Sequence, residues 1–162
     1  MIVAVVADTH LRAGRTRRLP EAAVEVMKGA DAILHAGDFV DRDALDEMSS
    51  LGPLHGVLGN NDHTLAGVLP ATRRLELEAV RVGMVHDSGP RKGREARMRR
   101  MFPDADVVVF GHSHIPVDAV GVDGQILFNP GSPTERRSQP ERTVGVLELS
   151  HGRVVGRRHV VV

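Results

Sequence analysis

Five short apolar runs, each followed directly by side chains that can bind metal, constrain this 162-residue chain more than any other feature. Short continuous apolar runs are typical of strands that are buried on both faces of a sheet. Ligands of open α/β sheets bind beyond the carboxyl ends of the strands. The pattern therefore predicts one site at one rim of a sheet, with donors for two metal ions. The runs and the residues that follow them are 2–7 with Asp8-Thr9-His10, 32–36 with Gly37-Asp38, 54–58 with Gly59-Asn60-Asn61-Asp62, 82–85 with His86-Asp87, and 107–110 with Gly111-His112-Ser113-His114.

Strands and helices alternate in the first half of the chain. Helices are expected from Pro20 to Gly29 and over 41–51, between strands at 2–7, 32–36 and 54–58, which indicates a parallel sheet. The second half predicts strands at 75–79, 82–86 and 107–110, a helix over 94–101, and hairpins at Asp123-Gly124 and His151-Gly152. We expect an α/β fold in which two mixed sheets pack face to face with helices outside.

The composition bounds the class of protein. The length predicts one domain over residues 1–162, and a formal net charge of zero gives no global attraction to nucleic acid or to an anionic membrane. Cysteine is absent, so disulfides and thiolate metal sites are excluded. No apolar stretch approaches the roughly 18 residues of a membrane span. We expect a cytoplasmic protein with no membrane partner, for which nucleic acid is a partner only as a phosphodiester substrate.

The donor types indicate which metals would bind. Carboxylate, amide and imidazole groups without sulfur suit Mn, Fe, Co, Ni or Zn rather than copper(I). Asp8 and His10 are two residues apart, as are His112 and His114, and in an extended loop this spacing points both side chains the same way. Asp38 follows a glycine turn and is a suitable bridge between two ions.

The order of these motifs along the chain resembles that of the calcineurin-like metallophosphoesterase family. The motifs are Asp-x-His, Gly-Asp, Gly-Asn-x-Asp, His and Gly-His-x-His. The resemblance is strongest to the family's small single-domain bacterial and archaeal branch, which hydrolyses phosphodiesters. It extends from Asp8 to His114, and the later segment Asn129-Pro130-Gly131-Ser132 is similar to one that is common in that branch.

The resemblance implies a four-layer α/β/β/α sandwich and a role for each matching position. Two divalent ions are expected, with manganese favoured and Fe, Ni, Co or Zn as alternatives. A water shared by the ions would lose a proton near neutral pH and attack phosphorus. Asp38, Asn60 and His112 are also expected to act in catalysis. The implied ligands are Asp8, His10 and His114 for the first metal, Asn60, His86 and His112 for the second, and Asp38 as the bridge.

Two positions depart from the family pattern. Many members have histidine where this chain has Asn61, and that histidine is thought to protonate the leaving group. Asparagine cannot act as a general acid, so cleavage of poor leaving groups is in doubt, and His63 is a candidate substitute. The Asn61→His variant is therefore expected to gain activity on such substrates. The second departure is His86-Asp87-Ser88, where the branch more often has His-Gly.

Most of the other histidines and basic residues are expected to have structural or surface roles. His35 is expected to be a packed or hydrogen-bonded core residue, and His55, His151 and His159 are expected to be structural or on the surface. Arg12 and Arg136 are candidates for contact with a substrate phosphate, because their segments should lie near the site. Arg15, Arg17 and Arg18 belong to the same basic cluster as Arg12, and the basic residues of 91–100 are expected to form a solvated helix face.

The sequence favours a dinuclear metal-dependent phosphodiesterase that acts on a small phosphoester. One alternative is a non-catalytic metal-binding or protein-interaction scaffold on the same fold, and another is a phosphomonoesterase. The natural substrate and the physiological metal are not specified, and small members of this branch are often homodimers or higher homo-oligomers.

Overall fold

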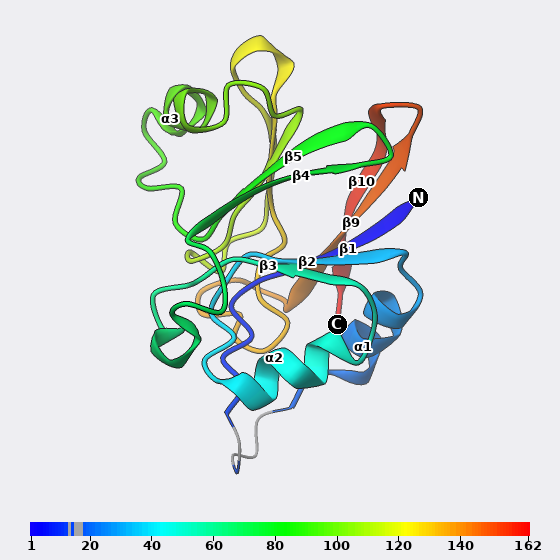
Figure 1. Ribbon diagram of the computed structural model, residues 1–162, viewed down its shortest axis with the longest axis vertical. Coiled ribbons are helices and arrows are strands. Elements are labelled where there is room, and N and C mark those ends of the chain that lie inside the picture. Colours follow the sequence, from blue (N-terminus) through cyan, green and yellow to red (C-terminus); the bar gives the residue numbers. More distant parts are fainter. Residues whose placement is uncertain (13, 15–17) are drawn as a thin grey trace.

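Two five-stranded mixed sheets form the centre of the protein (Figure 1). The computed structural model describes residues 1–12, 14 and 18–162. In the first sheet β1, β2 and β3 are parallel, and in the second β5, β6 and β8 are parallel. The first sheet has the order β10 (Arg153–Val161), β9 (Thr143–Ser150), β1 (Ile2–Val6), β2 (Ala32–His35) and β3 (Leu54–Gly56). The second has the order β4 (Thr72–Leu77), β5 (Val80–Val85), β6 (Val107–Val109), β8 (Ile126–Asn129) and β7 (Val117–Val120).

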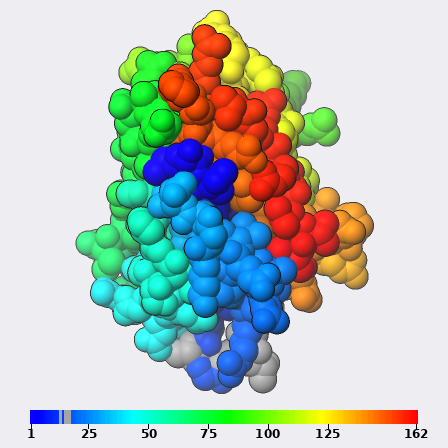
Figure 2. Space-filling view, turned by 90° about the vertical axis from the view of Figure 1, so that its right-hand side faces the viewer, coloured from blue at the N-terminus to red at the C-terminus, as the bar shows by residue number. Residues whose placement is uncertain are grey.

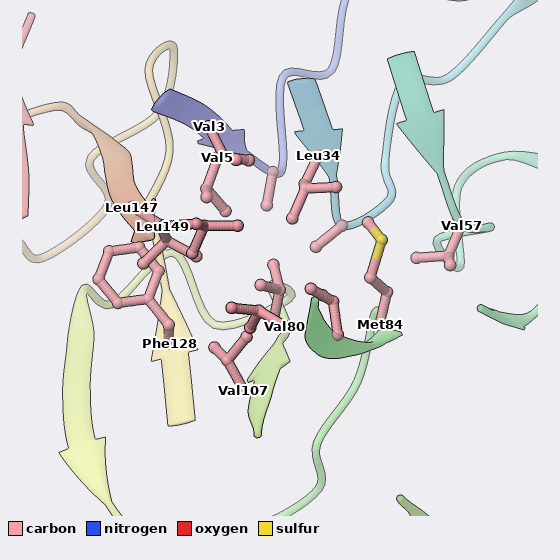
Figure 3. Close-up of a cluster of buried hydrophobic side chains, with 14 residues drawn as sticks. Val3, Val5, Leu34, Val57, Val80, Met84, Val107, Phe128, Leu147 and Leu149 are labelled. Atoms are coloured by element: carbon pink, nitrogen blue, oxygen red, sulfur yellow. The ribbon is translucent and has the colours of Figure 1, made fainter. Parts of the chain in front are cut away.

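The main hydrophobic core lies between the two sheets. Figure 3 shows side chains of the first sheet, such as Val5 and Leu34, facing those of the second, such as Val107 and Phe128. All four of these side chains are fully buried. Burial of apolar side chains on facing sheets is the main favourable term for such a stack.

Helices cover the outer face of each sheet, so the expected four-layer α/β/β/α sandwich is confirmed. Helices α1 (Glu21–Lys28) and α2 (Arg42–Ser49) lie on the first sheet, and α3 (Arg94–Met101) lies on the second (Figure 1). Buried Met27 of α1 packs with Val6 and Ile33, and Val160 of β10 packs against this cluster. The space-filling view shows the face on which α1 and β10 lie next to each other (Figure 2). No helix among the described residues is long and apolar enough to span a membrane.

The expected elements are present, but several boundaries shift by one to three residues; the strand expected over 54–58, for example, ends at Gly56. Helix α3 has the predicted bounds, and both predicted hairpins form as antiparallel pairs, β7 with β8 and β9 with β10. The strand expected over 75–79 instead ends at Leu77, because Glu78 and Ala79 adopt the left-handed conformation of a turn, with φ of 49° and 59°. β5 accordingly begins at Val80.

Replacement of Phe128 tests the inter-sheet core. Phe128→Ala removes a fully buried ring and should lower the free energy of unfolding by about 3–5 kcal/mol, measured by urea denaturation. Val120→Ala is the control, because Val120 is 59% exposed on β7, and it should change stability by less than about 0.5 kcal/mol. Equal effects of the two substitutions would contradict this description of the core.

Candidate metal centre

The seven expected metal ligands lie just beyond the carboxyl ends of strands from both sheets. Asp8 and His10 follow β1, Asp38 follows β2, and Asn60 follows β3 in the first sheet. The second sheet supplies His86 after β5 and both His112 and His114 after β6. The structure therefore brings together side chains that are up to 106 positions apart in the sequence (8 and 114).

The donors form two overlapping groups. In the first group, His10 Nε2 lies 3.3 Å from His114 Nε2, and His114 Nε2 lies 3.6 Å from Asp8 Oδ1. In the second group, Asn60 Oδ1 lies 3.0 Å from both His86 Nε2 and His112 Nδ1.

Asp38 lies between the two groups. Its Oδ2 is 3.6 Å from His10 Nε2 and 3.4 Å from His86 Nε2. One carboxylate oxygen thus faces a donor of each group, which is the position that a bridging ligand would need. Asp8 also approaches both groups, since its Oδ1 is 3.9 Å from His86 Nε2.

The ring orientations of His86 and His114 are fixed by contacts of Nδ1, the ring nitrogen that faces away from the other donors. His86 Nδ1 lies 2.7 Å from the Ala36 carbonyl oxygen, and His114 Nδ1 lies 2.8 Å from that of Glu135. A carbonyl only accepts, so each Nδ1 carries the hydrogen and each Nε2 lone pair faces the cluster. Burial lowers the pKa of His114, which favours the neutral ring that a metal requires.

The carboxylates have the environment of cation ligands. Asp8 is fully buried, and its Oδ2 has no hydrogen-bond partner among the residues described. Burial raises the pKa of Asp8 to about 7, although the charge of His86 opposes the rise. Burial alone would also raise the pKa of Asp38, but the His86 ring and two hydrogen bonds from Asn61 outweigh it and hold that pKa below its usual range. A divalent cation would satisfy Asp8 Oδ2 and offset the cost of burying both acids, so these residues fit metal ions.

Backbone strain is concentrated at this cluster. Five of the seven residues have a left-handed backbone, with φ of 55° at Asp8, 45° at His10, 64° at Asp38, 68° at His112 and 58° at His114. Such conformations cost of the order of 1 kcal/mol each for residues other than glycine and persist where the surrounding structure enforces them. Strain of this kind is typical of functional sites.

Asp62 is one of the groups that hold the strained loops, a role that the sequence did not reveal. Its buried carboxylate accepts hydrogen bonds from the backbone N–H groups of Asp38, Val40 and Gly59, at 2.9, 2.7 and 2.7 Å. These bonds join the loop after β2 to the loop after β3. The two loops touch so closely that a Cβ at Gly59 would lie 2.1 Å from Asp38 Oδ1.

A second brace comes from the segment after β8. Ser132 Oγ donates to the Asp8 carbonyl at 2.8 Å, and Thr134 Oγ1 donates to the Thr9 carbonyl at 2.8 Å. The Asn129 side chain donates to the Gly111 carbonyl at 2.9 Å. The Asn129-to-Ser132 segment noted in the sequence therefore links the loops after β1, β6 and β8.

The same segment brings an arginine to the rim of the cluster. Arg137 Nη1 donates to the His112 carbonyl at 3.4 Å, and its charge acts on both Asp8 and His114. Arg136, which the sequence favoured for phosphate contact, instead donates to the carbonyls of Gln139 and Pro140 in its own loop. Arg12 is exposed, while Arg15 and Arg17 lie outside the described residues.

The structure shows the surroundings of Asn61, of its candidate substitute His63 and of His35. Asn61 donates from its backbone N–H and from Nδ2 to Asp38, at 2.9 and 2.8 Å, and so orients that carboxylate. His63 is exposed at the start of the short helix η1 (His63–Leu65). The expectation that His35 is a core residue is confirmed, since it is fully buried, lies 3.1 Å from Thr9 Oγ1 and stacks on Phe39.

A four-layer α/β/β/α fold with such donors at its strand ends defines the class of metal-dependent phosphoesterases, and comparison with known proteins agrees. A family model described as the calcineurin-like phosphoesterase superfamily domain matches residues 1–152. A probable metallophosphoesterase from Methanothermobacter thermautotrophicus is 35% identical over 139 residues, which cover 85% of this chain and 80% of that protein. The chain belongs to the calcineurin-like phosphoesterase superfamily.

Solved structures share the fold. One is described as a novel archaeal phosphodiesterase, which is 21% identical with a TM-score of 0.77 and full coverage of both chains. Another is Vps29 from Entamoeba histolytica in complex with Zn²⁺, which is 21% identical with a TM-score of 0.78 and covers 100% of this chain and 98% of that one. The family implies divalent metal ions and a hydrolase that acts on phosphoesters, and the donors described above are the candidate residues to bind such ions.

Removal of the Asp62 carboxylate tests the brace between the loops. Asp62→Ala leaves three backbone N–H groups without their acceptor and should lower the free energy of unfolding by roughly 3 kcal/mol in chelator-treated protein. Glu25→Ala, at an exposed site on α1, is the matched control and should have little effect. A stability loss below about 1 kcal/mol for Asp62→Ala would show that these bonds do not hold the loops.

Proposed function

We propose that the protein is a dinuclear metal-dependent phosphodiesterase. The observation that carries this proposal is the strained convergence of seven oxygen and nitrogen donors from both sheets, with Asp38 between two groups. Asp8, His10 and His114 would hold the first cation, Asn60, His86 and His112 the second, and Asp38 both. Manganese is the favoured metal, and iron, nickel, cobalt or zinc would suit the same donors.

The chain's own residues prepare the site for a phosphodiester. When bound, the two cations would supply a nucleophile at neutral pH and offset the charge that develops on the phosphoryl oxygens. Asn61 orients the Asp38 carboxylate between the two groups, and Asp62 fixes the loops on either side of it. Asn60 and His112 are exposed, whereas Asp8, Asp38, His86 and His114 are buried, so the substrate would approach from the side of the first two.

The substrates best suited to this site are esters with good leaving groups. The Asn61 side chain is a hydrogen-bond donor to Asp38 and cannot transfer a proton to a leaving group. A leaving group that departs as a stable anion needs no such proton. We expect the catalytic role of three donors to lie in the cations that they would hold. These donors are Asp38, Asn60 and His112.

Two rival functions are separated by simple measurements. A scaffold would need none of the strain at the donors, and purified protein with zero or one metal ion per chain would favour it. A phosphomonoesterase would use the same donors, so relative rates on 4-nitrophenyl phosphate and bis(4-nitrophenyl) phosphate decide between the two enzymes.

Hydrolysis of bis(4-nitrophenyl) phosphate is the direct test of the function. Protein loaded with Mn²⁺ should release 4-nitrophenolate, chelation with EDTA should abolish release, and Mn²⁺ should restore it. Fully metallated protein that cleaves no member of a broad phosphoester panel would refute the proposal.

Asp38→Asn tests the bridging assignment. The loss of one negative charge between the two donor groups should reduce bound metal from about two ions per chain and lower turnover by roughly 10³-fold or more, a range typical of lost electrostatic stabilisation. Asp43→Asn, at an exposed site on α2, should retain both metal and turnover. Turnover of the Asp38 variant at the wild-type rate would rule out the bridge.

Arg137 is proposed to contact a phosphoryl oxygen of the substrate. Arg137→Ala should raise KM for bis(4-nitrophenyl) phosphate about tenfold, as expected for the loss of one charge-assisted hydrogen bond. Arg142→Ala is an exposed control in the same part of the chain. A larger KM increase for Arg136→Ala than for Arg137→Ala would favour the assignment made from the sequence.

A further inference from the structure

A cavity that the proposed chemistry does not use lies beside α3. It has a volume of about 460 Å³ and lies between the start of α3 and the chain that runs from the segment after β6 into β7. We call it the Arg94 groove. Its apolar lining includes Ile115, Pro116 and Val117. Its polar lining consists of Arg91, Arg94, Glu95, Ser113 and Asp118.

Both walls of the Arg94 groove are close along the chain to residues of the metal centre. Ser113 lies between His112 and His114, and the segment that leads to Arg91 begins at His86. Asp87, which departs from the family pattern, lines a smaller pocket of about 240 Å³ together with Asn60, His86 and His112. The charge of Asp87 also acts on Arg94. A molecule held by the two cations could therefore extend into the groove.

Arg94 has the environment of an anion receptor. Its guanidinium lies 5.0 Å from the centre of the Phe110 ring, and Nη2 makes a long hydrogen bond of 3.4 Å to the Gly89 carbonyl. Its Nε is buried and has no hydrogen-bond partner among the residues that the structure describes. Burial and the like charges of Arg97 and Arg91 lower the pKa of Arg94 and outweigh the opposing effect of Glu95 and Asp87.

Among the described residues, the acidic residues of the groove form no ion pair with Arg94. Asp118 lines the groove but already forms an ion pair with Arg157 at 2.7 Å, and Glu95 is exposed to solvent. Arg91 adds a second positive charge. Arg97 is engaged with the carbonyls of Ser88 and Pro90, at 2.8 and 2.5 Å, and so fixes the segment that forms one wall.

We propose that the Arg94 groove binds a second anionic group of the substrate, a phosphate carried on one arm of the phosphodiester. This inference rests on the proposed function, because it places the scissile phosphate at the metal centre and the second phosphate at Arg94. Arg94 would donate from its Nη atoms to phosphate oxygens, a contact for which a guanidinium is well suited. Ile115, 45% exposed, and Pro116 would contact the apolar body of that arm. The substrate class is thus a phosphodiester that bears an additional phosphate, as in a phosphorylated nucleoside ester.

Two matched esters test the groove by kinetics. Thymidine 5′-(4-nitrophenyl phosphate) and the same ester with a 3′-phosphate differ only in the second anion. With Mn²⁺-loaded wild type, the 3′-phosphate should lower KM about tenfold, a value expected for one charge-assisted contact. In Arg94→Met, which keeps an unbranched side chain against Phe110, the KM values of the two esters should become equal. Arg100→Met, at an exposed site on the same helix, should keep the wild-type ratio.

A binding measurement separates failure of the groove from failure of the proposed function. Calorimetric titration with thymidine 3′,5′-bisphosphate needs no turnover, and Arg94→Met should raise Kd about tenfold relative to wild type and Arg100→Met. Equal Kd values for the three proteins, or a wild type that does not distinguish the two esters, would overturn the groove while leaving the phosphodiesterase proposal standing. Binding that depends on Arg94, in metallated protein that cleaves neither these esters nor any member of the broad phosphoester panel, would support the groove and refute the phosphodiesterase.

Discussion

The cluster of two buried carboxylates and four imidazoles is the constraint on which the rest of this structure depends. The Nε2 lone pairs of His86 and His114 face carboxylate oxygens, and Asp8 Oδ2 is buried without a partner among the described residues. Such a set of acceptors is unfavourable unless positive charge is supplied. The surrounding protein is arranged to keep the cluster together at this cost.

The restraints come from three directions and act on the backbone. Asp62 collects three N–H groups from the loops after β2 and β3, and Ser132 and Thr134 hold the loop after β1. The close contact between Gly59 and Asp38 leaves no space for a side chain at position 59. These contacts act on the loops that hold Asp8, His10 and Asp38, three of the five donor residues with a left-handed backbone.

Much of the fold and of the donor set could be predicted because the signals are local. Apolar runs mark buried strands, a turn dipeptide marks each hairpin, and each predicted donor follows the end of a strand. The position of β9 beside β1 could not be predicted, because these strands are more than 100 residues apart and their pairing depends on the whole chain. The turn at Glu78 and Ala79 was also missed, because alternation continued through residues that have no marked turn preference.

The directions of side chains in the loops are the second feature that could not be predicted from the sequence. Asn61 could be seen as a missing acid but not as a donor to Asp38, and Asp62 could be seen only as a turn residue. Arg136 and Arg137 are adjacent and identical in type, but the backbone of Arg137 is left-handed, with φ of 49°, and only its side chain is bonded to His112 among the described residues. The direction of a side chain at such positions depends on the folded loop and cannot be deduced from the spacing of residues in the sequence.

The division of the donors between the two sheets has a consequence for how the protein folds. Asp8, His10, Asp38 and Asn60 extend from the first sheet, whereas His86, His112 and His114 extend from the second. A chain that has formed only one of its sheets has an incomplete donor set and would bind cations weakly. Metal binding would then come late in folding, after the two sheets have docked, and bound ions would slow the separation of the sheets.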